Sequence, residues 1–134
     1  SNLVLANNLA SMITPHRDDQ EGLDRAFAIA SRLRGTDVPP FQDTYGWIEY
    51  RRGNYKEALA YLEPAARGLP EDPFVQYHLA MTYIALERFE DARTTLNRML
   101  QLRIDLHRQI HQPHYYHPNK TRYLPHLCHQ HLFV

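Results

Sequence analysis

Residues 39–72 decide the fold, and they read PPFQDTYGWIEYRRGNYKEALAYLEPAARGLPED. The following stretch, residues 73–106, reads PFVQYHLAMTYIALERFEDARTTLNRMLQLRIDL and repeats the pattern of small and bulky apolar residues in phase. A step of 34 residues relates five pairs of matching positions: Gly46 and Ala80, Tyr55 and Phe89, Ala58 and Ala92, Leu62 and Leu96, Ala65 and Met99. An internal repeat of this length is typical of an array of stacked structural units.

The middle copy predicts two helices joined by a short turn. Phe41, Tyr45 and Ile48 recur at helical spacing, which predicts the first helix. Gly53-Asn54 then stops this helix, and Asn54 is expected to cap the start of the second one. In the second helix the apolar residues fall on one stripe, made of Tyr55, Ala58, Leu59, Leu62, Ala65 and Ala66.

Small residues and prolines predict how these helices pack and where they end. Gly46 and Ala58 should allow the two helices of the middle copy to approach closely, with bulky neighbours filling the space beside them. Pro70 and Pro73 flank a Glu-Asp pair that is expected to cap the next helix. Each helix pair has an apolar face that it cannot cover alone, so neighbouring pairs must stack.

At these positions the sequence resembles the tetratricopeptide repeat (TPR) family. That family has in order a small residue, an aromatic, an alanine, a bulky apolar residue, a second small residue and a proline. The middle copy holds them as Gly46, Tyr55, Ala58, Leu62, Ala65 and Pro70. The next copy matches through Ala80, Phe89, Ala92, Leu96 and Met99 but has Ile104 in place of the proline, and a looser first copy fits Leu9-Ala10, Leu23, Phe27 and Ala30.

The resemblance implies an all-α fold, a right-handed superhelix of stacked antiparallel helix pairs. The array is expected over residues 1–112, in three units at about 3–38, 39–72 and 73–106. Its last helix should run on without a stop signal to about Gln112 and serve as a capping helix. An irregular tail rich in His, Tyr and Pro is expected at 113–134.

In this family the first helix of each pair lines a concave surface, so the resemblance also implies a binding groove for a protein or peptide. The expected groove residues are Asn7, Asp43, Trp47, Tyr50, Phe74, Tyr77, Met81 and Ile84. Because Trp, Tyr and Met are frequent in binding hot spots, the stripe predicts an apolar or aromatic peptide or helix as the ligand. The alternative is that these rings are core residues between helices. One TPR subclass binds chaperone peptides through Lys and Asn side chains, and Asn7 fits it, but Asp43 and Tyr77 stand where a cation would help.

The C-terminal third differs from the repeats, because residues 101–134 carry seven of the nine histidines. A metal-binding module is therefore the alternative function, with His107, His111, His114 and His117 as candidate ligands. Their spacing is irregular and no paired cysteines accompany them, so no metal is expected. For residues 113–134 three interpretations stay open: a disordered tail, a tail docked into the groove of its own molecule or of a second copy in a homodimer, and a non-native extension.

No catalytic motif is present, so an enzyme is not expected and no cofactor is implied. Fifteen basic residues balance fifteen acidic ones, which argues against a nucleic-acid partner, and no apolar run approaches the roughly 20 residues that cross a bilayer. Residues 43–47 and 50–55 also resemble C-terminal repeats of bacterial cell-envelope TPR proteins. That resemblance implies the cell envelope as the location, with the cytoplasm as the alternative.

Overall fold

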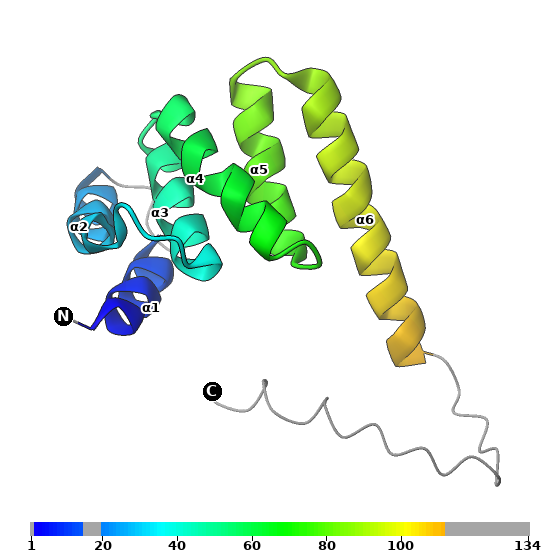
Figure 1. The fold of residues 1–134 in the computed structure, drawn as a ribbon, viewed down its shortest axis with the longest axis horizontal. Helices are drawn as coiled ribbons and strands as arrows, with labels where there is room; N and C mark the ends of the chain where they lie inside the picture. Colours follow the sequence, from blue (N-terminus) through cyan, green and yellow to red (C-terminus); the bar gives the residue numbers. More distant parts are fainter. Residues whose placement is uncertain (1, 15–19, 112–134) are drawn as a thin grey trace, which may run out of the picture.

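The structure is a computed structural model that describes residues 2–14 and 20–111, and these residues form helices joined by short turns (Figure 1). The elements in chain order are α1 (Leu3–Ile13), α2 (Gln20–Ala30), the 3₁₀ helix η1 (Ser31–Leu33), α3 (Pro39–Arg51), α4 (Tyr55–Gly68), α5 (Pro73–Ala85) and α6 (Phe89–His111). They pack as the pairs α1/α2, α3/α4 and α5/α6, which follow one another in chain order from one end of the molecule to the other (Figure 1). The predicted all-α fold of stacked helix pairs is confirmed.

Most helices begin and end at the capping, proline and glycine residues that the sequence predicts. Asp72 caps α5, because its side chain accepts hydrogen bonds from the backbone N–H groups of Phe74 at 2.9 Å and Val75 at 3.4 Å. Pro73 occupies the first turn, where its missing N–H costs nothing. The turn between α3 and α4 passes through Gly53 at a φ of +81°, a conformation that glycine adopts without strain.

The expected side-chain cap at Asn54 is wrong. Asn54 precedes α4, but its side chain makes no capping hydrogen bond and instead donates from Nδ2 to Glu49 Oε2 at 2.6 Å. The reason is that the Glu49 side chain is buried, with the residue only 3 % exposed, and a buried carboxylate needs donors. Arg52 supplies the countercharge at 3.2 Å. The turn therefore satisfies a buried charge rather than the first N–H groups of α4.

The predicted close approach of α3 and α4 takes place at Gly46. A Cβ atom built on Gly46 would lie 2.8 Å from Leu62 Cγ and 3.2 Å from the carbonyl oxygen of Ala58. Separations below 3.0 Å are shorter than real Cβ contacts, so only glycine fits without a shift of α4. The pair α3/α4 is thus held at a distance that its small residues set.

The buried core lies at the boundaries between helix pairs. One cluster joins α1, α2 and η1 to α3, and contains Ala6, Ala10, Ala26, Ala30, Leu33, Tyr45 and Ile48. The other joins α4 to α5 and α6, and contains Ala58, Leu62, Ala65, Ala66, Val75, Leu79, Tyr83 and Ala92. Because both clusters draw on more than one pair, no pair buries its apolar face alone, as stacked repeats require.

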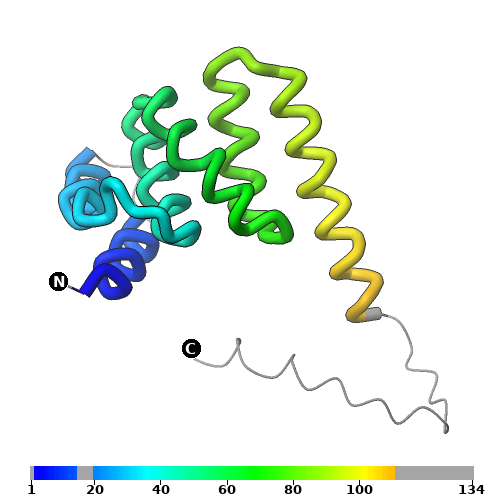
Figure 2. The backbone as a smooth tube through the Cα atoms, viewed as in Figure 1, coloured from blue at the N-terminus to red at the C-terminus, as the bar shows by residue number. Residues whose placement is uncertain are grey.

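The last helix extends well beyond its neighbour. It has 23 residues and α5 has 13, so α6 continues for about 15 Å past α5 at 1.5 Å per residue (Figure 2). α6 ends at His111, close to the end expected near Gln112. Large apolar side chains are exposed on the extension, namely Leu100, Ile104, Leu106 and Ile110. That the extension caps the array stays a prediction.

Replacing Gly46 by alanine should destabilise the protein. Helix propensity alone predicts a gain of about 1 kcal/mol for this change, whereas the clash with Leu62 and the Ala58 carbonyl predicts a loss of about 1–3 kcal/mol. The free energy of unfolding, from urea titration followed by circular dichroism at 222 nm, decides between the two signs. An unchanged or higher value for Gly46→Ala would show that α3 and α4 can separate freely.

Tyr83 should make the stability depend on alkaline pH. Burial and then the hydrogen bond from its hydroxyl to Glu63 Oε1, at 2.9 Å, raise the pKa of Tyr83 to about 12. The ordinary value is about 10, so the folded state holds this proton more tightly than the unfolded state. The stabilisation is complete below about pH 10 and is lost as the pH rises towards 12.

We therefore expect Tyr83→Phe to lower the free energy of unfolding by roughly 1 kcal/mol at pH 8, and by less near pH 11. Urea titrations of both proteins at the two pH values measure this difference, and taking the difference cancels the titration of the other tyrosines. A gap between the two proteins that does not change with pH would contradict the prediction.

Candidate functional site

The first helices of the three pairs, α1, α3 and α5, are joined side by side by polar contacts. The hydroxyl groups of Ser11 on α1 and Thr44 on α3 lie 3.0 Å apart. Asp43 on α3 contacts His78 on α5, with 2.8 Å between Oδ1 and Nδ1. Arg51 of α3 also donates to the backbone carbonyl that follows α1, at 2.8 Å. We call the face that these helices form together the α1–α3–α5 surface.

A cluster of stacked rings lies at the α3–α5 junction of this surface. The rings of Trp47 and Tyr50 are 4.7 Å apart and nearly parallel, with an interplanar angle of 6°. His78 stacks on Trp47 at 4.1 Å and 17°, and Tyr77 approaches the indole at 6.0 Å in a tilted arrangement. Tyr50 also contacts Tyr55, at the start of α4, at 5.4 Å. The cluster is a pre-arranged aromatic platform, because ring contacts from both helices hold Trp47 in place.

The sequence prediction missed His78. This residue orients the cluster, since it stacks on Trp47 while Asp43 holds its Nδ1. A signal for it was present, because His78 follows Thr44 by one 34-residue step. In the structure Thr44 contacts the preceding first helix through Ser11, and His78, at the equivalent position of the next pair, contacts α3 through Asp43.

The structure brings part of the predicted groove set together. Asp43, Trp47, Tyr50 and Tyr77 belong to the cluster around the indole. On α5, Phe74 is 73 % exposed and Ile84 is 39 % exposed, whereas Met81 is half-buried. Asn7 is half-buried on α1, and its Nδ2 donates to Asn8 at 3.3 Å rather than to the cluster. The alternative of rings buried between helices thus describes Trp47 and Tyr50 in part, while Phe74 and Tyr77 remain open to solvent.

The charges on this surface are few and mostly engaged. The Asp43 carboxylate is held by His78, and each of these side chains is 16 % exposed. Lys56 is the one lysine in the described part of the chain, and it lies on α4. The surface therefore lacks the lysines with which one TPR subclass holds a peptide carboxylate. Its chemistry is that of rings and aliphatic side chains, with few groups to recognise a charged ligand.

Other candidate sites find less support in the described residues. No three His, Cys, Asp or Glu side chains come together there to hold a metal ion. Of the candidate ligands, His107 is an exposed residue of α6 and His111 is the last residue of that helix, while His114 and His117 lie outside the described residues. The predicted tail at 113–134 also lies outside them. None of the helices described has the length and apolarity that a membrane span needs.

The chain was compared with family models, curated proteins and solved structures to find what surfaces of this kind bind. The family model of the tetratricopeptide repeat matches residues 49–103, which cover the end of α3, all of α4 and α5, and most of α6. No curated protein and no solved structure matches the chain. Tetratricopeptide repeats generally mediate protein–protein interaction, and their partners are proteins. The matched residues, the 34-residue step and the stacked helix pairs agree, and we conclude that residues 49–103 are a tetratricopeptide-repeat segment.

Proposed function

We propose that the protein is a non-enzymatic scaffold whose α1–α3–α5 surface binds an apolar or aromatic peptide segment or helix of a partner protein. One observation carries the proposal: Tyr77 is exposed on α5 beside the stacked rings of Trp47 and Tyr50, and Phe74 is exposed about one helical turn before it. An exposed group of large apolar side chains is costly in water, and such groups mark interaction sites. The family supports a protein as the ligand.

The geometry favours an apolar ligand on energetic grounds. Covering Phe74, which is 73 % exposed, would remove a large apolar area from water at about 25 cal/mol per Å². The stacked rings are already ordered by their mutual contacts, so binding would cost them little rotamer freedom. An acidic or basic ligand would gain less, because Asp43 is already engaged by His78.

The ligand could also come from the protein itself. Residues 113–134 contain Tyr115, Tyr116, Leu124 and Phe133, which have the same apolar and aromatic chemistry as the proposed ligand. A second copy of the chain would bring the same segment to the surface from outside. Light scattering at several protein concentrations separates the cases, because only binding between copies produces a dimer whose fraction rises with concentration.

The double variant Phe74→Ala/Tyr77→Ala tests the site itself. Peptides are first selected on the wild-type protein from a random phage-displayed library, and their affinities are then measured by titration of the Trp47 fluorescence. Trp47 is the one tryptophan of the chain, so its emission reports directly on this surface. We expect the double variant to weaken binding at least about tenfold, since each truncated hot-spot ring costs more than about 1 kcal/mol.

Phe89→Ala is the matched control. Phe89 is 62 % exposed at the start of α6, outside the proposed surface, so its loss should leave the affinity within about twofold. Thermal melting of all variants checks that they remain folded. Equal affinities of the wild type and the Phe74→Ala/Tyr77→Ala variant would show that the peptides bind elsewhere.

A further inference from the structure

A second site candidate lies between α4 and α6, away from the ring cluster. No Cα atom of α4 lies within 8 Å of a Cα atom of α6, although both helices pack against α5. The result is an open cleft of about 470 Å³ whose floor is the α5 face that carries Gln76, Leu79 and Tyr83. A volume of this size is in the range of sites that bind a few residues of a peptide.

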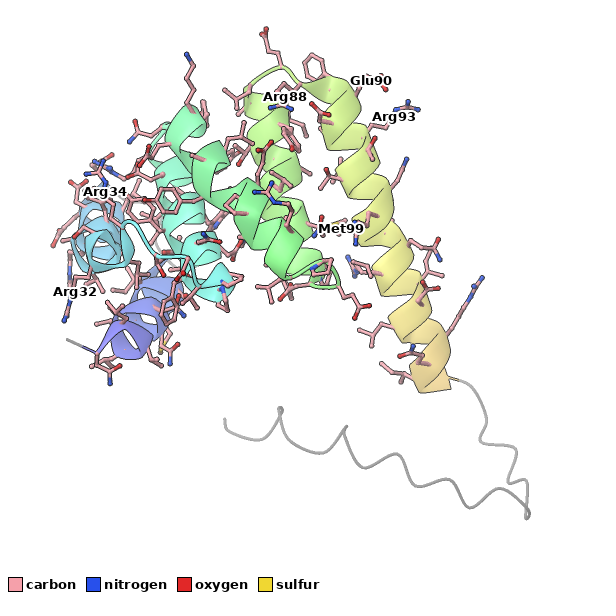
Figure 3. All side chains as sticks on the ribbon, viewed as in Figure 1. Arg32, Arg34, Arg88, Glu90, Arg93 and Met99 are labelled. Atoms are coloured by element: carbon pink, nitrogen blue, oxygen red, sulfur yellow. The ribbon has the colours of Figure 1, made fainter. Side chains whose placement is uncertain are left out.

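Two arginines line this cleft from different helices, Arg67 from α4 and Arg98 from α6. Both are exposed, and within residues 2–14 and 20–111 neither has a hydrogen-bond or ion-pair partner. Glu90 and Arg93 pair with each other at 2.7 Å and point away from α5, so they do not neutralise the cleft (Figure 3).

The acidic residue of the lining is already engaged. Glu63 accepts a hydrogen bond from the Tyr83 hydroxyl at 2.9 Å and lies 3.8 Å from Arg88. Arg88 is also held by Asp91 at 2.8 Å, and its guanidinium lies over the Tyr83 ring at 4.6 Å. Glu63 and Asp91 share the one guanidinium of Arg88, so this group keeps a net charge of −1. Neither carboxylate contacts Arg67 or Arg98, and the lining of the cleft carries these two arginines against the one glutamate.

We propose that this cleft binds an acidic peptide segment, with carboxylates on Arg67 and Arg98 and an apolar side chain on the floor at Leu79. Guanidinium groups bind carboxylates through paired hydrogen bonds, and the attraction is stronger beside a low-dielectric floor than in open water. A nucleic acid fits less well, since two cations do not make the extended basic track that a phosphate backbone requires.

The cleft and the α1–α3–α5 surface lie on different sides of α5. Phe74, Tyr77 and Ile84 belong to that surface, whereas Leu79 and Tyr83 form the cleft floor. At 3.6 residues per turn the mean directions of the two sets are roughly 150° apart around the helix axis. Separate segments can therefore occupy the two sites at once, and the cleft proposal does not depend on the proposed function of the first surface.

The test uses the full chain and a fluorescein-labelled peptide of four glutamates around one leucine, with both ends blocked. Fluorescence anisotropy should show binding that the double variant Arg67→Gln/Arg98→Gln weakens at least about tenfold. The control is Arg25→Gln/Arg32→Gln, which removes the same charge from α2 and η1 at the opposite end of the molecule (Figure 3). This control should keep the affinity within about twofold.

Three outcomes would overturn the proposal. Equal weakening by both double variants would mean that the peptide responds only to net charge. No measurable binding by the folded wild-type protein would mean that the cleft is no peptide site. Tighter binding of a labelled oligothymidylate, weakened by the same variant, would assign the cleft to phosphates. Phe74→Ala/Tyr77→Ala should leave peptide binding unchanged, so the two sites succeed or fail separately.

Discussion

The close approach of α3 and α4 at Gly46 is the constraint on which the rest of the structure depends. Leu62 fills the space where a Cβ of Gly46 would lie, so Gly46 faces α4. At about 100° per residue its neighbours Tyr45 and Trp47 then lie on opposite flanks of that contact. Tyr45 turns into the core against Tyr61, at a ring separation of 4.5 Å, and Trp47 turns towards α5. The same packing contact therefore builds the core of the pair and presents the ring cluster.

A buried charge fixes the other end of α3. Glu49 lies in the core side of the helix, and Arg52 and Asn54 come back from the turn to hold it. Arg52 also places its guanidinium over the Phe27 ring at 3.5 Å, so the same residue connects the first two pairs. A charge buried without these partners would be strongly destabilising, which gives the turn a reason to keep this polar sequence. Arg52 and Asn54 thus tie the turn to the buried Glu49 on the core side of α3.

Sequence reasoning succeeded where a feature depends on neighbours in the chain, and failed where it depends on distant helices. The small residue at Gly46 and the cap at Asp72 could be predicted because each acts within one pair or one turn. The stacking of His78 on Trp47 could not, because it depends on how α5 sits against α3. The failed cap at Asn54 has the same origin, since a propensity for capping says nothing about a buried carboxylate five residues earlier. Binding by the predicted groove residues stays a prediction.

The position of α5 between two different neighbours explains why the molecule has two distinct surfaces. Towards α3 it contributes rings and aliphatic side chains, held by the contact of His78 with Asp43. Towards α4 and α6 it contributes a floor edged by charged side chains, because those two helices do not meet across it. Stacked pairs leave such a gap wherever their second helices diverge, so the side chains that line the gap lie at positions that the repeat pattern does not constrain.

Arg67 and Arg98 are residues of this kind, since neither belongs to the small and apolar positions that recur at 34 residues. Neither guanidinium has an ion-pair partner within residues 2–14 and 20–111, so both are available to the acidic segment that we propose for this cleft.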